Sequence, residues 1–197
     1  MTGVQTCALP ISDDLIGTLS KFAEEKGIEV YIVTGDRDAL QLATDNVRVV
    51  INKKGMSEKE IYDKNKMIEE YGVTPTEFID VKGLMGDKSD NIPGVPGIGN
   101  KTALKLIKEY GSIENVLENV ENISGKKMKQ NLIDYREQAI LSKKLATICK
   151  DVPIEINLDE IKSKEDYDIQ GVKLLFQSLG FKSLVDNIGD KDRKSVV

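Results

Sequence analysis

The stretch LMGDKSDNIPGVPGIGNKTALKLI, residues 84–107, is the feature that most constrains how this chain can fold. Two prolines and three glycines within residues 93–99 interrupt any helix or strand, because proline lacks a backbone N–H and glycine favours turns. Apolar residues with helical spacing follow over residues 100–109. Asp87 and Asp90 come directly before the turn. The chain therefore places an acidic pair, a glycine-rich turn and the start of a helix next to one another.

Two runs of β-branched residues predict strands upstream of this turn. They are IEVYIVTG, residues 28–35, and VRVVIN, residues 47–52. A helical stripe of apolar residues over 13–26 precedes them, and Ser12 is placed to cap that helix. Helix, strand, short helix and strand in this order are typical of an α/β sheet.

Beyond residue 74 the sequence is mainly helical. Apolar residues recur with helical spacing in five segments, which are 75–85, 100–109, 112–120, 127–145 and 168–179. VPIEIN, residues 152–157, is a further candidate strand. We therefore predict an α/β fold class, with a partial parallel-type sheet and flanking helices over residues 13–73 and an all-helical lobe over residues 74–185.

The two ends of the sequence look unlike the rest. MTGVQTCALPIS, residues 1–12, has no helical or strand period and resembles translated sequencing-adapter sequence. The closing DRKSVV has the same character. We therefore expect residues 1–12 to be a non-native end and residues 186–197 to be a partly non-native tail, the alternative being native disordered ends.

The absence of histidine restricts the chemistry that the chain can perform. No histidine occurs among the 197 residues, which excludes histidine general bases, histidine zinc ligands and the usual catalytic triads. Cys7 and Cys149 are too few and too far apart for a disulfide framework or a zinc site. Reactions would therefore depend on carboxylates, lysines, hydroxyl groups or metal ions. No apolar run approaches the ~18 residues of a membrane span, and we expect a cytoplasmic protein.

Three acidic pairs provide the candidate catalytic residues and metal ligands. They are Asp13 with Asp14, Asp36 with Asp38, and Asp87 with Asp90. Any one pair alone would be interpreted as a helix cap or a solvated turn. However, the TGDRD turn directly follows a predicted strand, and open α/β sheets bind ligands at the carboxyl ends of strands. Converging carboxylates repel by ~4 kcal/mol per close pair at an effective dielectric constant of about 20.

Divalent cations would relieve this repulsion. Mg²⁺ and Mn²⁺ prefer oxygen ligands, and two such ions about 4 Å apart promote phosphoryl chemistry. A calcium-binding EF-hand loop beginning at Asp36 is excluded, because Gln41 and Val47 occupy the positions that require glycine and glutamate. The sequence therefore predicts a site for Mg²⁺ or Mn²⁺.

The glycine-rich turn and the helix after it form a candidate DNA-binding surface. The sequence GIG opens the helix, so backbone N–H groups and the positive helix end favour an anion there. Lysines recur on one face of this helix as far as Lys108, a pattern that suits a sugar–phosphate backbone. GIGNKT lacks the spacing of a Walker loop. The candidate DNA contacts are Gly94, Gly97, Ile98, Gly99, Lys101, Thr102 and Lys105.

Four ordered motifs give the sequence a specific resemblance: DDLIGTL, TGDRDALQL, LMGDKSDNIPGVPGIGNKTALKLI and REQAILSKKLATI. Over residues 13–185 the chain resembles the 5′-nuclease domain of bacterial DNA polymerase I, a member of the flap-endonuclease family of 5′-3′ exonucleases. The resemblance implies a PIN-like sheet and a helix-three-turn-helix motif, a kind of helix-hairpin-helix, around residues 86–110. It also implies hydrolysis of a phosphodiester near a DNA 5′ end or flap junction, in replication and repair.

The resemblance further implies cofactors and partners. Two Mg²⁺ or Mn²⁺ ions would be held by the six aspartates named above, and K⁺ by backbone carbonyls of the turn. DNA would be the partner of a monomer that contacts no membrane. The family's glutamate and alanine before the first acidic pair fall at Ile11 and Ser12, and other early ligands have no counterpart. We therefore expect the distal part of a catalytic domain, with negligible activity by itself.

Two other functions are compatible with parts of the sequence. GDKSDN is similar to the late acidic motif of haloacid-dehalogenase-like phosphatases, but DRDAL departs from their nucleophile motif at its last position. A non-catalytic helix-hairpin-helix DNA-binding fragment would also need the turn and its lysines, and its acidic residues would bind no metal.

Overall fold

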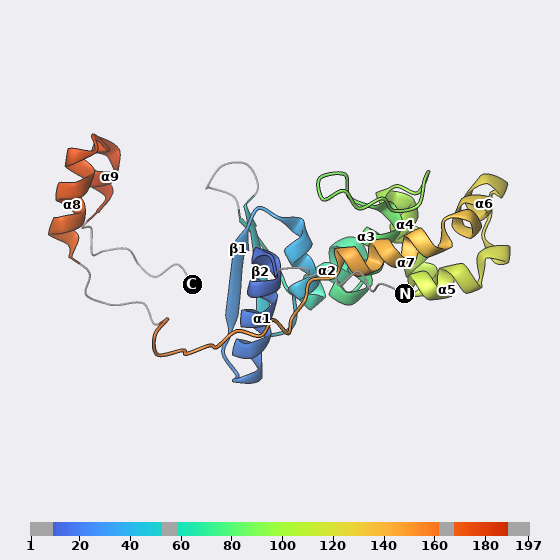
Figure 1. Ribbon diagram of the computed structural model, residues 1–197, viewed down its shortest axis with the longest axis horizontal. Coiled ribbons are helices and arrows are strands. Elements are labelled where there is room, and N and C mark those ends of the chain that lie inside the picture. The colour runs from blue at the N-terminus through green and yellow to red at the C-terminus, as the bar shows by residue number, and fades with distance from the viewer. Residues whose placement is uncertain (1–9, 53–58, 162–167, 189–197) are drawn as a thin grey trace, which may run out of the picture. The chain divides into compact units, whose positions relative to one another are not determined.

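The chain divides into two compact units, Met1–Ile154 and Glu155–Val197. The computed structural model describes residues 10–52, 59–161 and 168–188 (Figure 1). The second unit contains α8 (Ile169–Ser178) and α9 (Lys182–Asn187). The ring of Phe176 in α8 packs edge to face on the ring of Phe181, the residue before α9, with centroids 6.0 Å apart. No helix within these described ranges is long and apolar enough to cross a membrane.

The first unit begins with a small mixed sheet. Its elements are α1 (Ser12–Glu25), β1 (Val30–Thr34), the 3₁₀ helix η1 (Arg37–Leu42), β2 (Val47–Asn52) and β3 (Lys59–Tyr62). The strand order is β1-β2-β3, with β1 and β2 parallel and β3 antiparallel to β2. The parallel pair and the short helix between its strands confirm the predicted α/β class. β3 was not predicted, and Asp14 rather than Ser12 accepts the backbone N–H of Ile11 at the start of α1.

β1 is less buried than its composition predicts. Ile32 is 7% exposed, but Val33 is 64% and Tyr31 is 47% exposed. Side chains alternate across a strand, so the face of β1 that carries Ile32 packs on the core while the other face is accessible. The prediction of a strand at VPIEIN is wrong, because that segment forms no strand.

Helices build the rest of the first unit. They are α2 (Lys64–Tyr71), α3 (Pro75–Met85), α4 (Asn100–Tyr110), α5 (Ile113–Glu118), the 3₁₀ helix η2 (Val120–Asn122), α6 (Lys126–Asp134) and α7 (Arg136–Ala146). Three of these, α3, α4 and α5, each match one predicted segment, whereas α2 was not predicted. The single helix expected over 127–145 is two helices, since the first ends at Asp134 and Tyr135 separates it from the second.

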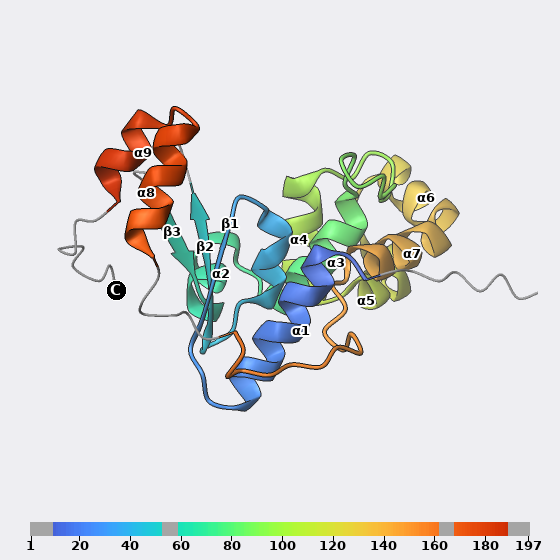
Figure 2. The ribbon, with the colours of Figure 1, turned by 60° about the vertical axis from the view of Figure 1, so that its left-hand side comes forward.

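Helix α3 lies at the centre of this unit. A reciprocal pair of side-chain bonds between Thr74 and Glu77 caps its start, and Phe78, Val81 and Leu84 are buried. α3 runs beside α7 in both views (Figures 1 and 2). The helices approach closely at Gly83, where a Cβ would lie 2.9 Å from the backbone N and Cα of Lys143.

An ion pair with a buried carboxylate connects the same helices. The carboxylate of Asp80 is 4% exposed, accepts the backbone N–H of Ile113 at 2.9 Å and pairs with Lys143 Nζ at 2.7 Å. Burial raises the pKa of Asp80 although both donors oppose that effect. One carboxylate thereby joins α3 to the start of α5 and to α7.

The replacement Gly83→Ala should destabilise the fold. Alanine gains about 1 kcal/mol of helix propensity over glycine, but overpacking against α7 costs about 1–3 kcal/mol. The Cβ would also lie 2.7 Å from Ile113 Cδ1. We expect a net loss of about 1 kcal/mol in urea unfolding. Gly35→Ala is the control, because a Cβ there meets nothing within 4 Å; equal stability of the two variants would contradict the close approach.

Candidate metal centre and nucleic-acid interface

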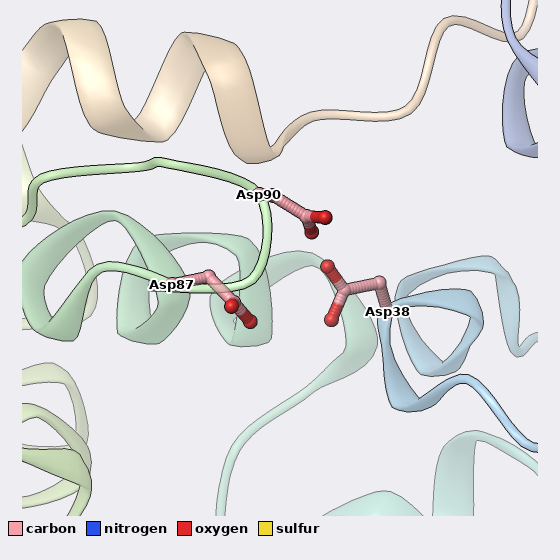
Figure 3. A group of neighbouring side chains, drawn as sticks. All are labelled: Asp38, Asp87 and Asp90. Carbon is pink, nitrogen blue, oxygen red and sulfur yellow. The ribbon is translucent and has the colours of Figure 1, made fainter.

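Three aspartates from distant parts of the chain meet beside α3. Asp38, Asp87 and Asp90 each offer a carboxylate oxygen, and these oxygens all lie within 4.8 Å of one another. Figure 3 shows the three side chains directed into a common space, Asp38 from η1 and the other two from the loop after α3. The structure thus brings together members of two of the acidic pairs.

Local hydrogen bonds position Asp38. β1 ends at Thr34, whose Oγ1 accepts the N–H of Asp36 at 3.0 Å. The Asp36 carboxylate accepts the N–H of Asp38 at 2.9 Å and caps η1. The turn after the strand therefore directs Asp38 toward α3, while the Asp36 side chain remains exposed.

A closed loop positions the other two aspartates. Asp87 and Ile92 exchange both backbone hydrogen bonds, at 2.9 and 2.7 Å, and the Asp87 carboxylate accepts the N–H of Ser89 at 2.8 Å. Asn91 takes the left-handed conformation with φ 57°, which asparagine tolerates better than most residues. Asp90 lies at the exposed tip and makes no hydrogen bond or ion pair with another described residue.

A lysine that sequence reasoning did not single out lies between two of the carboxylates. Lys82, on α3, is 8% exposed, and its ammonium pairs with Asp38 and, at 2.9 Å, with Asp87. The only signal in the sequence is a lone lysine in the otherwise apolar end of α3. Its positive charge offsets part of the repulsion within the acidic group.

The pKa values of the two carboxyls that pair with Lys82 shift in opposite directions. The hydrogen bond from Lys82 is the main cause that lowers the pKa of Asp87 to about 2, and Ser89 assists it. Burial raises the pKa of Asp38, with the charges of Asp36 and Asp87 adding to burial and Lys82 opposing both. Burial would lower the pKa of Lys82, but its hydrogen bonds to the two carboxylates outweigh burial and raise it.

The three aspartates have the chemistry and spacing of a divalent-cation site. Mg²⁺–oxygen distances of about 2.1 Å place neighbouring ligand oxygens ~3 Å apart and opposite ones ~4.2 Å apart. Oxygens within 4.8 Å of one another need only a small side-chain adjustment to reach that spacing. An ion there would have to share Asp38 and Asp87 with the Lys82 ammonium.

The other expected ligands lie outside this group of three. Asp13 is half-buried, and its pKa is raised by burial and then by the charges of Asp36, Asp14 and Asp90. Asp13 therefore lies within electrostatic reach of the acidic group. Both oxygens of Asp14 accept backbone N–H groups, one from Ile11 at 3.0 Å and one from Cys149 at 2.8 Å. Metal binding by the six aspartates stays a prediction.

The glycine-rich turn packs tightly against the acidic loop. Gly86 and Gly94 have positive φ values of 71° and 61°. A Cβ on Gly86 would lie 2.6 Å from the Ile92 carbonyl oxygen, and one on Gly94 would lie 2.5 Å from the Met85 carbonyl carbon. Only glycine permits this backbone crossing. The loop carrying Asp87 and Asp90 therefore closes directly beneath the turn.

The predicted DNA contacts differ in accessibility. Gly94 and Ile98 are buried, so they shape the turn, and Thr102 is half-buried. Gly97 and Gly99 are exposed, and Gly99 is the N-cap of α4. The face of α4 that carries Lys101, Lys105 and Lys108 is exposed, and none of these lysines forms an ion pair with another residue in the described ranges. DNA binding by these residues stays a prediction.

Three polar side chains from α6 and α7 hold the turn from its inner side. Asn131 donates to the Pro96 carbonyl at 2.7 Å and Gln138 to the Gly94 carbonyl at 2.7 Å, while Ser142 Oγ accepts the Gly94 N–H at 3.0 Å. Sequence reasoning missed these residues. The only signal was that REQAILSKKLATI, which includes two of them, contributed to the family resemblance.

An α/β part with clustered carboxylates, joined to helices that carry a hairpin-like turn, is the arrangement of nucleases with a PIN-like fold. A family model for the 5′-3′ exonuclease N-terminal resolvase-like domain matches residues 10–72, and one for the 5′-3′ exonuclease C-terminal SAM fold matches residues 73–168. The chain belongs to the 5′-3′ exonuclease family. This membership excludes the phosphatase alternative.

Relatives and solved structures agree with this assignment. DNA polymerase I of Bacillus caldotenax is 50% identical over 177 residues, and that of Bacillus subtilis is 47% identical over 179 residues, covering 90% and 91% of this chain. The chain spans about a fifth of the length of these relatives, 20% in both cases.

Two nuclease structures share the fold. T5 5′-exonuclease with bound zinc ions has a TM-score of 0.60 and 29% identity, and the match covers 70% of this chain and 49% of that one. The catalytic core of Rad2 in complex with DNA has a TM-score of 0.55 at 15% identity, covering 82% of this chain and 54% of that one, which supports the fold alone.

The replacement Lys82→Met should destabilise the fold more at neutral pH than at acidic pH. The folded-state pKa of Asp87, about 2, lies below its ordinary value of 3.8, so its pairing stabilises the fold above about pH 4 and is lost as pH falls through 2. Without the ammonium, two half-buried carboxylates lose their counter-charge, at a cost on the order of 3 kcal/mol near pH 7.

Urea unfolding of wild-type protein and Lys82→Met between pH 2.5 and pH 7 would measure this difference. The deficit of the variant should be largest at neutral pH and shrink toward pH 2.5, because the carboxyls of the variant, which lack the ammonium, become protonated as pH falls while wild-type protein loses part of the stabilisation from Asp87. Exposed Lys88 gives the control Lys88→Met. A deficit that is the same at both pH values would show that Lys82 acts by packing and not by charge.

Proposed function

We propose that this chain is the distal part of the metal-dependent 5′-3′ exonuclease and 5′ flap endonuclease domain of a bacterial DNA polymerase I. The observation that carries the proposal is the convergence of Asp38, Asp87 and Asp90 to within 4.8 Å, directly beside a glycine turn that opens a lysine-bearing helix. The substrate would be DNA with a 5′ end or flap, and the reaction hydrolysis of a phosphodiester in replication and repair.

The acidic residues would hold two divalent cations, Mg²⁺ or Mn²⁺. Such ions supply charge neutralisation at the phosphoryl oxygens and lower the pKa of water when they are bound. Asp38, Asp87 and Asp90 would be ligands of one ion. Asp13 and Asp36 would lie near the other ion. Asp14 would contribute by fixing the start of α1, since backbone donors engage both of its oxygens. Oxygen donors alone favour hard cations over zinc.

The turn and α4 would hold the DNA backbone. Exposed N–H groups at Gly97 and Gly99 and the lysines of α4 offer donors and positive charge without reading bases. K⁺ could bind the carbonyls of Gly94, Val95 and Pro96 only through their second lone pairs, because each of these carbonyls accepts a hydrogen bond. All of these groups come from one chain, so a monomer suffices. A T5 flap endonuclease 28% identical to this chain has been solved with DNA and metal ions.

A second candidate function is DNA binding without hydrolysis. The ammonium of Lys82 already pairs with two of the three clustered carboxylates, which favours a pocket that is stable without metal. Metal titration separates the two candidates.

Isothermal titration calorimetry with Mg²⁺ and Mn²⁺ tests the nuclease proposal. We expect saturable binding to the wild-type chain and at least tenfold weaker binding to Asp90→Asn, because this variant lacks one of the three proposed carboxylate ligands. The variant should fold normally, since Asp90 is exposed and its replacement leaves no buried partner unpaired. Asp45→Asn, at an exposed aspartate outside the cluster, is the control. Identical metal binding by wild-type protein and Asp90→Asn would contradict the proposed centre.

The lysine face of α4 should contribute a salt-dependent part of DNA binding. Each phosphate contact contributes about −0.9 to the slope of log K against log salt concentration on duplex DNA. Lys101→Ala and Lys105→Ala should therefore weaken binding of a labelled flap duplex and each make the slope shallower by ~0.9. Fluorescence anisotropy at several salt concentrations measures both effects. An unchanged slope, equal to that of the exposed-site control Lys64→Ala, would contradict this role.

A further inference from the structure

Helix α7 contacts each of the three segments that supply the proposed site. These segments are η1, which carries Asp38; the end of α3, which leads to Asp87; and the glycine turn. Three residues of α7 make the polar contacts to η1 and the turn: Gln138, Ser142 and Ala146, which recur every four residues on one face. None of the three is a candidate metal ligand or DNA contact.

One end of this face holds the turn. The backbone N–H of buried Gly94 donates to Ser142 Oγ at 3.0 Å, and the Gly94 carbonyl accepts from the Gln138 amide at 2.7 Å. Ser142 is fully buried. Both polar atoms of the Gly94 backbone are therefore fixed by α7, on the residue where the turn crosses the acidic loop.

The other end of α7 holds η1. Gln41 is 4% exposed, and its amide nitrogen donates to the Ala146 carbonyl at 3.0 Å. The amide oxygen of the same side chain accepts the N–H of Ile148 at 2.9 Å. Gln41 thus satisfies backbone groups at the end of α7 and fixes the position of a 3₁₀ helix whose second residue is Asp38.

Between its two ends α7 packs against α3. Gly83 permits backbone-to-backbone approach to Lys143, and α3 leads from there to Gly86 and Asp87. The turn contact at Ser142 and the η1 contact at Ala146 are one helical turn apart, about 6 Å along the axis. The polar contacts are directional and buried, and leaving such groups unsatisfied is unfavourable.

We propose that α7 sets the distance between the turn that holds the DNA backbone and the acidic pocket, with Gln41, Gln138 and Ser142 as positioning residues. The proposal rests on the nuclease function proposed above. In that function, the distance between the DNA phosphates bound at the turn and the clustered aspartates would decide which phosphodiester reaches the metal ions. Loss of a positioning contact would let the turn, together with the loop that carries Asp87 and Asp90, move relative to Asp38 on η1, and the choice of phosphodiester would become less precise.

Iron-mediated cleavage of bound DNA tests this spacing without requiring hydrolysis. Fe²⁺ replaces Mg²⁺ on the full chain bound to an end-labelled 5′ flap duplex, and ascorbate with hydrogen peroxide then generates hydroxyl radicals at the ion. Cuts in the DNA report which nucleotides lie next to the pocket. We expect one cluster of cuts for wild-type protein, and a cluster displaced by at least one nucleotide or at least twofold broader for Gln41→Met, Ser142→Ala and Gln138→Ala.

Controls separate positioning from a loss of folding. Gln138 is half-buried, so Gln138→Ala should keep the fold even if the buried variants lose it, as circular dichroism would verify. Gln130→Ala is its matched control, because exposed Gln130 bonds only Asp134 within α6, and it should keep the wild-type cluster. Ser20→Ala matches Ser142→Ala, since buried Ser20 bonds the Gly17 carbonyl within α1.

Two different results would overturn the proposal and are distinguishable. If wild-type protein gives an iron-dependent cluster and folded Gln138→Ala keeps it unchanged, α7 does not set the spacing. If wild-type protein binds neither DNA nor metal and gives no cluster, the proposed nuclease function itself fails, and the inference fails with it.

Discussion

The buried ammonium of Lys82 is the interaction on which the proposed site depends. It allows η1 and the loop after α3 to bring carboxylates together, because the charges of Asp38 and Asp87 would otherwise repel at close range. The ammonium therefore stabilises the cluster of carboxylates. A divalent ion would have to compete with this positive charge, so Lys82 would both organise the proposed ligands and limit how tightly they hold metal.

A steric constraint connects the acidic loop to the turn. Because Gly86 and Gly94 cross with no room for a side chain, the loop that begins at Asp87 ends where the turn begins. A displacement of the turn would therefore carry Asp87 and Asp90 with it. This explains why an acidic pair precedes a glycine-rich turn in the sequence: the proposed metal ligands and the backbone proposed to hold DNA belong to one closed segment.

Local signals in the sequence were sufficient to predict most elements and the meeting of Asp38 with the later acidic pair. β-branched runs marked β1 and β2, and helical spacing marked α3 and α4. The exposure of Val33 and the break at Tyr135 depend on tertiary packing, which such patterns do not encode. Gln41 and Ser142 were missed because their partners lie more than 40 residues away in the sequence. Lys82 was missed because a single polar residue in an apolar segment produces no periodic pattern.

Charge distribution, rather than net charge, reconciles an acidic chain with a nucleic-acid partner. The formal charge is −5, yet the lysines of α4 lie exposed beside the turn, and screening confines each charge to about 10 Å at 0.1 M salt. The lysine face therefore attracts phosphates locally, while the carboxylates of the pocket repel them. Cations bound among those carboxylates would reverse the second effect, because a phosphate would then meet positive charge at both places. Metal and DNA should thus each favour the binding of the other, and the fixed distance proposed between the two places would make that mutual effect selective for one phosphodiester.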